Sequence, residues 1–159
     1  MSRHGPEIVC DAMLGGLARW LRAAGYDAEF SYGIGDEELI LRALRTGAVL
    51  LSSDGGLFDR NVIRHKTVRA LYVPRDLPKA RQLAFVLGEL GLGVREESRC
   101  MACGGALEEV DKAAVREEVP AKAYAAHDRF WRCDRCGKLL WRGTHWRKIA
   151  AVLDQIRCR

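Results

Sequence analysis

Hydrophobic and polar positions divide the first ninety residues into two alternating kinds of segment. Short apolar runs bounded by turn residues indicate buried strands, whereas apolar residues spaced three and four apart indicate helices. The expected strands are residues 7–10, 28–31, 48–51 and 70–73, and the expected helices are residues 14–24, 36–46, 57–65 and 78–90. This alternation predicts an α/β fold, a three-layer sandwich on a mainly parallel sheet.

Two cysteine pairs mark the second half of the chain. They are Cys100 with Cys103 and Cys133 with Cys136, and a glycine follows each pair. A Cys-x-x-Cys turn presents both sulfurs on one side, and the glycine allows the positive φ that folds the backbone back. Four sulfurs complete a tetrahedral set for a structural zinc ion. Because such a site is closed, we expect zinc to build a scaffold and the chemistry to lie in the first hundred residues.

The cysteine pairs also predict a division into two domains. We expect residues 1–95 to form the α/β domain and residues 96–159 to form a zinc ribbon. The 29 residues between the pairs, 104–132, exceed the usual spacing in a zinc module, so we expect a β excursion or hairpin there. The pattern over residues 146–156 predicts a final helix.

Composition and cysteine usage narrow the class of protein. The chain has 159 residues, 48% of them hydrophobic, which suffices for one ordinary domain and a small module. No apolar run approaches the roughly 20 residues of a membrane span, and no basic-then-apolar signal opens the chain. We therefore expect a cytoplasmic protein whose paired cysteines bind metal. Of the other two cysteines, Cys10 is expected in the core and Cys158 has no assigned role.

Basic residues concentrate toward the C-terminus. Residues 1–99 carry 14 Lys and Arg against 13 Asp and Glu, whereas residues 129–159 carry nine against two. Phosphates pair with cations and unpaired bases stack on aromatic rings, so the interleaved aromatics of this basic segment suit RNA. The alternative is a solvated basic face whose rings pack around zinc. The aromatic residues are Phe130, Trp131, Trp141 and Trp146, and the candidate RNA contacts are Arg132, Lys138, Arg142, Arg147 and Lys148.

Two further candidate RNA contacts lie on the first predicted helix. Arg19 and Arg22 could meet phosphates there, with surface solvation as an equal alternative. The charge distribution nevertheless predicts that the basic C-terminal segment, and not the α/β domain, supplies most of the affinity for RNA.

Three aspartates are expected at one edge of the sheet. Asp11 and Asp54 each follow a predicted strand, and Asp36 opens a helix that starts at the same edge. Carboxyl ends of parallel strands line the ligand crevice of such a sheet. Clustered carboxylates repel one another and favour Mg²⁺ or Mn²⁺, which can activate water to attack a phosphodiester.

Each aspartate also has a local explanation. Asp36 is a good N-cap, Asp11 can cap the helix that follows it, and Asp54 suits a turn before two glycines. Capping is the better explanation for each residue taken singly, whereas their common edge favours a metal site. Glu37 and Asp59 are candidate fourth acids, while Glu38 is expected to be solvated.

The segment 10–22, followed by residues 25–27, resembles the opening of the Mut7-C RNase domain family. The resemblance continues through residues 36–39, 50–54, 119–120, 130–133 and 137–146 and includes both cysteine pairs. It implies a PIN-like nuclease fold with an appended zinc ribbon. It also implies metal-dependent RNA cleavage by Asp11, Asp36 and Asp54, with Ser52 as a supporting hydroxyl residue.

The sequence thus predicts a ribonuclease that depends on Mg²⁺ or Mn²⁺ and uses its zinc ribbon to hold RNA. The rival hypothesis is a non-catalytic RNA- or ribosome-binding module, in which the acids are caps and the ribbon carries the function. A redox or zinc-sensing role would need an exposed reactive thiol, against which a fully ligated four-cysteine site argues.

Overall fold

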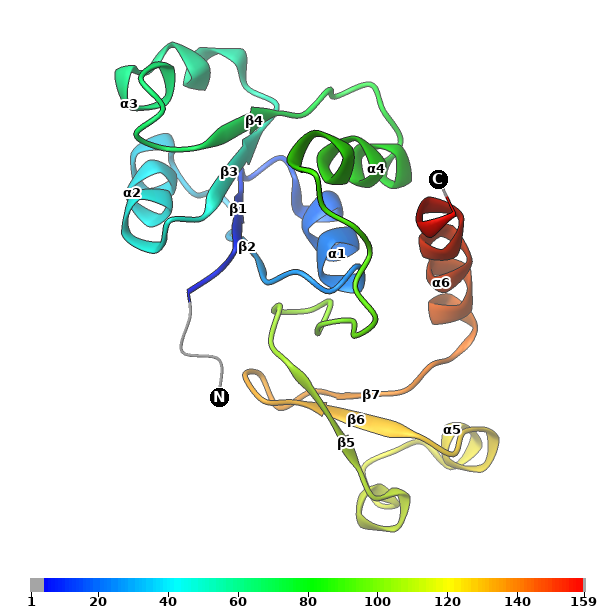
Figure 1. The fold of residues 1–159 in the computed structure, drawn as a ribbon. Helices are drawn as coiled ribbons and strands as arrows, with labels where there is room; N and C mark the ends of the chain where they lie inside the picture. The colour runs from blue at the N-terminus through cyan, green and yellow to red at the C-terminus, as the bar shows by residue number, and fades with distance from the viewer. Residues whose placement is uncertain (1–4, 159) are drawn as a thin grey trace.

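A computed structural model describes residues 5–158 and contains a parallel four-stranded sheet (Figure 1). The strands lie in the order β2-β1-β3-β4, and all neighbours are parallel. They are β1 (Ile8–Cys10), β2 (Ala28–Phe30), β3 (Val49–Ser52) and β4 (Ala70–Tyr72). Helices α1 (Gly15–Ala23), α2 (Asp36–Thr46), α3 (Asn61–Arg64) and α4 (Lys79–Leu90) connect them or follow them. The predicted alternation of strand and helix is therefore confirmed.

Helices cover both faces of this sheet, which makes three layers (Figure 1). Side chains of a strand alternate between faces, and β1 follows this rule: Ile8 and Cys10 pack with α1 and α4, whereas Val9 packs with α2. Both faces are thus sealed by apolar packing, which explains why β1 and β3 are buried along their whole length. Cys10 lies in this core, as predicted, and burial raises the pKa of its thiol to about 12.

The helix predicted over residues 57–65 is wrong in one respect, because it is interrupted. The segment forms a 3₁₀ helix, η1 (Gly55–Asp59), and then the short helix α3. Arg60 lies between them in an extended conformation, with φ −65° and ψ 135°. Two glycines at the start favour a tight turn over an α-helix, and Asp54 stabilises this turn by accepting a hydrogen bond from the Gly56 backbone N–H at 3.0 Å.

The C-terminal segment contains a three-stranded antiparallel sheet in the order β5-β6-β7. Its strands are β5 (Leu107–Val110), β6 (Phe130–Cys133) and β7 (Leu139–Leu140), and η2 (Lys112–Val115) and α5 (Ala121–Ala126) lie between β5 and β6. The predicted β excursion is therefore present, but it contains two helical turns as well. Val115, Val119 and Phe130 form a small core beneath it.

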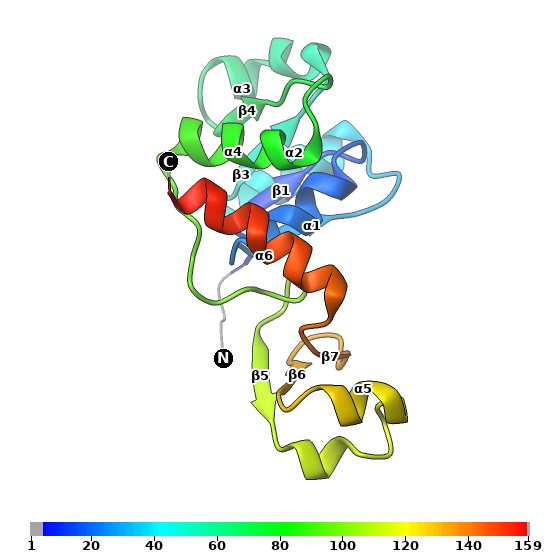
Figure 2. The same ribbon diagram turned by 90° about the vertical axis from the view of Figure 1, so that its right-hand side faces the viewer.

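The last helix, α6 (Thr144–Arg157), leaves the small sheet and returns to the α/β domain. It crosses in front of α1 in Figure 2. Ile149 and Leu153 are 4% and 2% exposed and belong to the same core cluster as Leu17 and Leu83 of α1 and α4. The division at residues 95 and 96 stays a prediction, and the structure adds that α6 completes the core of the first domain.

Charged side chains join the two parts of the molecule. Asp27, only 4% exposed, accepts hydrogen bonds from both terminal nitrogens of Arg135 at 3.1 and 2.8 Å. Arg22, 5% exposed, donates to the carbonyls of Ala28 and Met101 at 2.8 and 2.9 Å. These contacts fix the cysteine turns against the α1–β2 connection. None of the described helices combines the length and apolarity needed to cross a membrane.

Replacing Leu153 by Ala tests whether α6 belongs to the core. Truncating a buried leucine leaves a cavity, so we expect the free energy of unfolding to fall by about 2–5 kcal/mol. Urea denaturation of the zinc-loaded protein measures it. Leu44→Ala is the matched control, because Leu44 is 42% exposed on α2. Equal stability of the two variants would contradict the packing of α6.

Candidate metal centre and acidic sheet edge

The four paired cysteines converge on one point. The ligand atoms of Cys100, Cys103, Cys133 and Cys136 all lie within 4.8 Å of one another. The closest sulfurs, of Cys103 and Cys133, are 3.4 Å apart, and those of Cys100 and Cys136 are 3.8 Å apart. Zinc–sulfur bonds of about 2.3 Å place the sulfurs of a tetrahedron about 3.8 Å apart. The spacing of the donor atoms therefore fits zinc.

The backbone around the cysteines also fits a thiolate site. Gly104 and Gly137 have φ of 85° and 75°, as the sequence predicts for the residue after each pair. Backbone N–H groups of Gly105 and Arg135 donate to the sulfurs of Cys103 and Cys133 at 3.3 and 3.4 Å. Such bonds stabilise sulfur in its anionic form.

The thiols need a cation to ionise together. Burial raises the pKa of Cys100 and raises that of Cys103 to about 12. Burial also opposes ionisation of Cys133, but hydrogen bonds from the backbone N–H groups of Cys136 and Arg135 lower the pKa of Cys133 to about 7. Four thiolates at this separation repel one another, and Zn²⁺ removes that repulsion. The chemistry of the donor set thus agrees with its geometry.

Asp11 and Asp54 lie at the carboxyl edge of the parallel sheet, as predicted, after the adjacent strands β1 and β3. Ser52 connects them: its hydroxyl donates to Asp11 Oδ2 at 2.6 Å and accepts from the Asp54 backbone N–H at 2.9 Å. The chain runs from β1 to β2 on one side and returns past β1 to β3 on the other. The carboxyl ends of β1 and β3 therefore mark the topological switch point of the sheet, where ligands of such folds bind.

Local roles explain two of the three aspartates in part. Asp11 Oδ1 accepts from the Met13 backbone N–H at 3.2 Å, which stabilises the turn before α1 but does not cap it, because Leu14 is the N-cap and no side chain bonds there. Asp54 caps η1. Asp36 behaves otherwise. It is the first residue of α2, Gly35 occupies the N-cap position, and no side chain caps this helix. The interpretation of Asp36 as an N-cap is therefore wrong, because the chain enters the helix one residue earlier.

The acidic residues do not form a compact cluster. Among residues 5–158, the only group of three or more His, Cys, Asp or Glu side chains placed closely enough to hold one metal ion is the cysteine set. Glu37 lines a groove with Arg60 and Asn61 between α2 and α3, and Asp59 is exposed at the end of η1. A cation site built from Asp11, Asp36, Asp54 and either fourth acid stays a prediction.

The candidate RNA contacts separate into paired and unpaired cations. Arg132 pairs with Glu118 at 2.8 Å, and Arg22 is buried between carbonyl groups. We therefore revise Arg22 from a surface residue to one that positions the cysteine turns. No ion pair of the described residues involves the remaining candidates, which are Arg19, Lys138, Arg142, Arg147 and Lys148.

The tryptophans of the basic segment have distinct surroundings. Trp141 packs edge-on against Phe130, with ring centroids 6.2 Å apart, and Trp146 packs against the α/β core. Trp131 lies beneath the guanidinium groups of Arg129 and Arg142, 5.1 and 4.7 Å from its ring centroid. The three tryptophans therefore pack against Phe130, the α/β core and two arginines, and not around zinc as the alternative interpretation expected. All three are only partly buried.

Sequence reasoning missed Arg75, which lies beside the acidic edge. Its Nε donates to the Ser53 carbonyl at 3.0 Å, next to both Ser52 and Asp54. The residue stands alone in the loop after β4, and no motif or spacing marks it. It also missed the role of Asp27 and Arg135, because a contact between positions 108 residues apart has no local signal.

Comparison with known proteins agrees with this architecture. Residues 6–153 match the Mut7-C RNAse domain family, so the chain belongs to that family. Neither the search of curated proteins nor the search of solved structures found a match. The family is defined as an RNase domain, which indicates a nuclease-like role with RNA as the substrate.

Replacing Cys133 by Ser tests the zinc site. The native protein should contain one zinc per chain, whereas the variant should lose it and unfold beyond residue ~100, because metal binding and folding are coupled in such modules. Elemental analysis measures the metal, and circular dichroism the folding. Cys158→Ser is the control, since Cys158 is exposed and lies outside the cluster. Native protein without zinc would reject the site.

Replacing Arg135 by Ala tests the contact with Asp27. The variant removes both hydrogen bonds that Arg135 donates to the buried Asp27 carboxylate and leaves only Arg99, 3.7 Å away, as its cation. Stability should therefore fall by about 1–3 kcal/mol. Arg129→Ala is the matched control, because Arg129 pairs with Glu109 at the surface and its loss should matter less. Chemical denaturation of zinc-loaded variants compares them. A larger loss for Arg129→Ala would contradict the assigned role of Asp27.

Proposed function

We propose that this protein is a cytoplasmic, Mg²⁺- or Mn²⁺-dependent ribonuclease of PIN-like fold that cleaves RNA phosphodiester bonds at the carboxyl edge of its parallel sheet. The supporting observation is the Ser52 hydroxyl, which donates to the Asp11 carboxylate and accepts from the Asp54 backbone N–H where the adjacent strands β1 and β3 end. In this proposal the zinc ribbon is structural and helps to hold the RNA. Asp36 approaches the same edge from the start of α2.

The residues at this edge suit a hard divalent cation. Carboxylate oxygens are the ligands that Mg²⁺ and Mn²⁺ prefer. The carboxylate oxygens of Asp11 and Asp54 each accept at most one hydrogen bond in the structure, so each has a lone pair left for a cation. Asp11 and Asp54 would hold the cation, with Asp36 as the third ligand. When bound, the cation would offset negative charge on the phosphate and lower the pKa of the attacking water.

The other residues at the edge would position the acids. The Ser52 hydroxyl and the Met13 backbone N–H each donate to one oxygen of Asp11, which fixes the orientation of its carboxylate. Asp11 is also 8% exposed, so its charge lies in a partly dehydrated site, where electrostatic interactions are stronger than in water. Arg75 places a cation at the same edge, suitably for a phosphate group.

Two observations favour the second candidate, a non-catalytic RNA- or ribosome-binding protein. One carboxylate oxygen of Asp54 caps η1, and the three aspartates are not among the side chains placed closely enough to hold one metal ion. In that case the acids stabilise local turns, and RNA binding by the ribbon is the function. The two candidates differ in whether removal of a charge at Asp11 or Asp54 changes cleavage.

Asp54→Asn separates a cation ligand from a cap. Asparagine caps as well as aspartate does, so the free energy of unfolding should change little. Loss of a ligand should lower Mn²⁺-dependent cleavage of labelled RNA by on the order of 100-fold or more. Ser52→Ala removes only a hydrogen-bond partner of the ligand Asp11, so it should lower cleavage by about 10–100-fold. Single-turnover cleavage and thermal melting, measured on the same samples, give both quantities.

Asp11→Asn should behave as Asp54→Asn does, because its amide can still accept from Met13 and donate to Ser52. The control is Asp128→Asn, whose side chain is 97% exposed in the ribbon. Full cleavage by both Asp11→Asn and Asp54→Asn would overturn the assignment of these acids. RNA that binds to the native protein but is never cut, with either cation present, would favour the binding module.

A further inference from the structure

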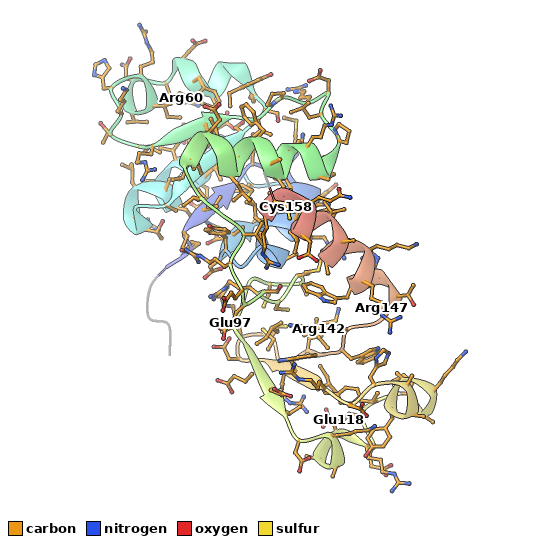
Figure 3. The ribbon with its side chains drawn as sticks, turned by 45° about the vertical axis from the view of Figure 1, so that its right-hand side comes forward. Arg60, Glu97, Glu118, Arg142, Arg147 and Cys158 are labelled. Atoms are coloured by element: carbon orange, nitrogen blue, oxygen red, sulfur yellow. The ribbon has the colours of Figure 1, made fainter. Side chains whose placement is uncertain are left out.

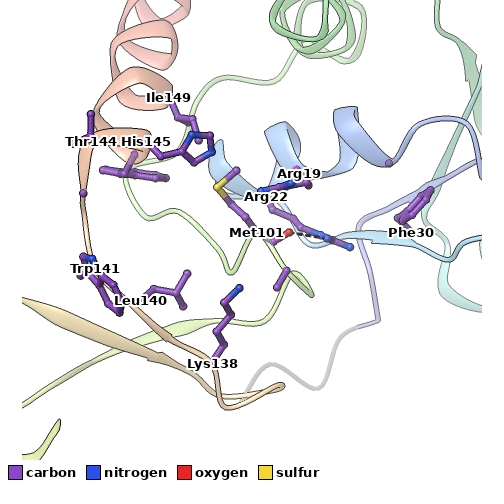
Figure 4. Close-up of a pocket in the computed structure, with 14 residues that line it drawn as sticks. Arg19, Arg22, Phe30, Met101, Lys138, Leu140, Trp141, Thr144, His145 and Ile149 are labelled. Carbon is purple, nitrogen blue, oxygen red and sulfur yellow. Dashed lines mark hydrogen bonds between the residues drawn. The ribbon is translucent and has the colours of Figure 1, made fainter. Parts of the chain in front are cut away.

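A cleft of about 720 Å³ lies between the two parts of the molecule. Helix α1 and the end of β2 form one wall, and β7 and the start of α6 form the other (Figure 4). Its volume is that of a site for a nucleotide-sized ligand. The ligand can be inferred from the charges and rings that line the cleft.

The charge of this cleft is entirely basic. Arg19 enters from α1, Lys138 points up from the β6–β7 turn, and His145 lies at the start of α6 (Figure 4). No aspartate or glutamate lines it. Arg19 and Lys138 are exposed, and none of the ion pairs found within residues 5–158 includes either of them. Two cations without acidic partners favour an anionic ligand.

Ion pairs reduce the number of free cations in the basic C-terminal segment. Four of its arginines are paired with acids: Arg129 with Glu109, Arg132 with Glu118, Arg135 with Asp27 and Arg157 with Asp154. Much of the local charge is thereby neutralised, and Figure 3 places Glu118 at the far end of the small sheet from Arg142 and Arg147. The free cations are left near the junction with α6, where the cleft opens.

Aromatic rings complete the wall opposite α1. Trp141 and Trp146 line the cleft and are only partly buried. Trp141 is supported by Phe130, and the guanidinium group of Arg142 lies 5.6 Å from the ring centroid of Trp146. Rings held in place in this way can stack with a base at low entropic cost, and such stacking contributes about 1–3 kcal/mol per base.

The cleft reaches the sheet edge that carries Asp11. Gly15 and Phe30 line it, and they lie just after β1 and at the end of β2, on the carboxyl side of the sheet. The two residues are in close contact, since a Cβ on Gly15 would lie 2.9 Å from the Phe30 ring. Gly15 follows Asp11 by four residues. An RNA strand that left the cleft at Gly15 would therefore pass toward Asp11.

We propose that the cleft binds unpaired nucleotides of single-stranded RNA. Arg19 and Lys138 bind phosphates, and Trp141 or Trp146 stacks with a base. In a duplex the bases stack on one another, so they cannot reach these rings, and the site selects single strands. The direction of the strand toward Asp11 rests on the proposed ribonuclease function, whereas binding in the cleft does not.

Fluorescence anisotropy with a labelled ten-nucleotide RNA of mixed sequence tests the proposal. The full, zinc-loaded chain is used without added Mg²⁺ or Mn²⁺, and gels confirm that the RNA stays intact. The single strand should bind more tightly than the same RNA annealed to its complement. Arg19→Gln and Lys138→Gln should each reduce the slope of log affinity against log salt by about 0.7, the value for one phosphate contact on a single strand.

Two matched controls separate the cleft from general basic charge. Lys122→Gln removes an exposed cation of α5 that does not line the cleft, and Arg45→Gln removes one on α2 across the sheet. Both should keep the slope of the native protein. Binding should also quench tryptophan fluorescence, and at least one of Trp141→Phe and Trp146→Phe should reduce the quenching. Zinc content and melting temperature verify that every variant is folded.

The outcomes distinguish this proposal from the ribonuclease proposal. If Arg19→Gln and Lys138→Gln both kept the native salt slope, or if the duplex bound more tightly, the cleft would not be the binding site for single strands. This would hold even if Asp11-dependent cleavage were found. Binding that depends on both residues would support it even if no RNA were cut. A DNA strand of the same sequence is the last arm: weaker binding of DNA assigns RNA, and equal binding assigns unpaired nucleotides with either sugar.

Discussion

The buried ion pair between Asp27 and Arg135 holds the cysteine turns against the α/β domain. Asp27 is buried directly before β2, and Arg135 lies between the zinc-ligand positions Cys133 and Cys136. A buried carboxylate is costly without a cation, so Asp27 stabilises one orientation of the cysteine turns. Gly104 is required at the same point, because a Cβ there would lie 2.8 Å from Asp27 Oδ1. The same contacts therefore shape both the cysteine site and the interface between the two domains.

Much of the fold could be predicted because its signals are local. The apolar strands, the glycines that end α2 and α4, and the paired cysteines each act within a few residues. The break at Arg60 was missed because the apolar spacing of residues 57–65 continues through it, whereas the turn depends on the Asp54 side chain. The packing of α6 was missed because amphipathic spacing shows that a face is buried but not which surface covers it.

In the candidate sites too, local features could be predicted and contacts between distant segments could not. Strand ends and topology predicted the edge shared by Asp11 and Asp54, and Ser52, known from the family resemblance, proved to contact both residues. Topology did not predict how far apart the carboxylates lie, since that depends on side-chain conformation. The fate of Arg22 and the pairing of the basic residues depend on contacts between distant segments. Charge counted along a sequence therefore overstates the charge that is free to meet a ligand.

The cleft exists because the ribbon is held against the α/β domain at two places. Arg135 anchors the cysteine turns, and Ile149 and Leu153 anchor α6 in the core. Met101 and Lys138, close to the first anchor, and Ile149, in the second, all line the cleft. Two anchors on either side fix its width before any ligand arrives, which lowers the entropic cost of binding. In the proposed complex, zinc would contribute to ligand binding through the first anchor, because Arg135 belongs to the second cysteine turn and that turn must keep its shape for Arg135 to reach Asp27.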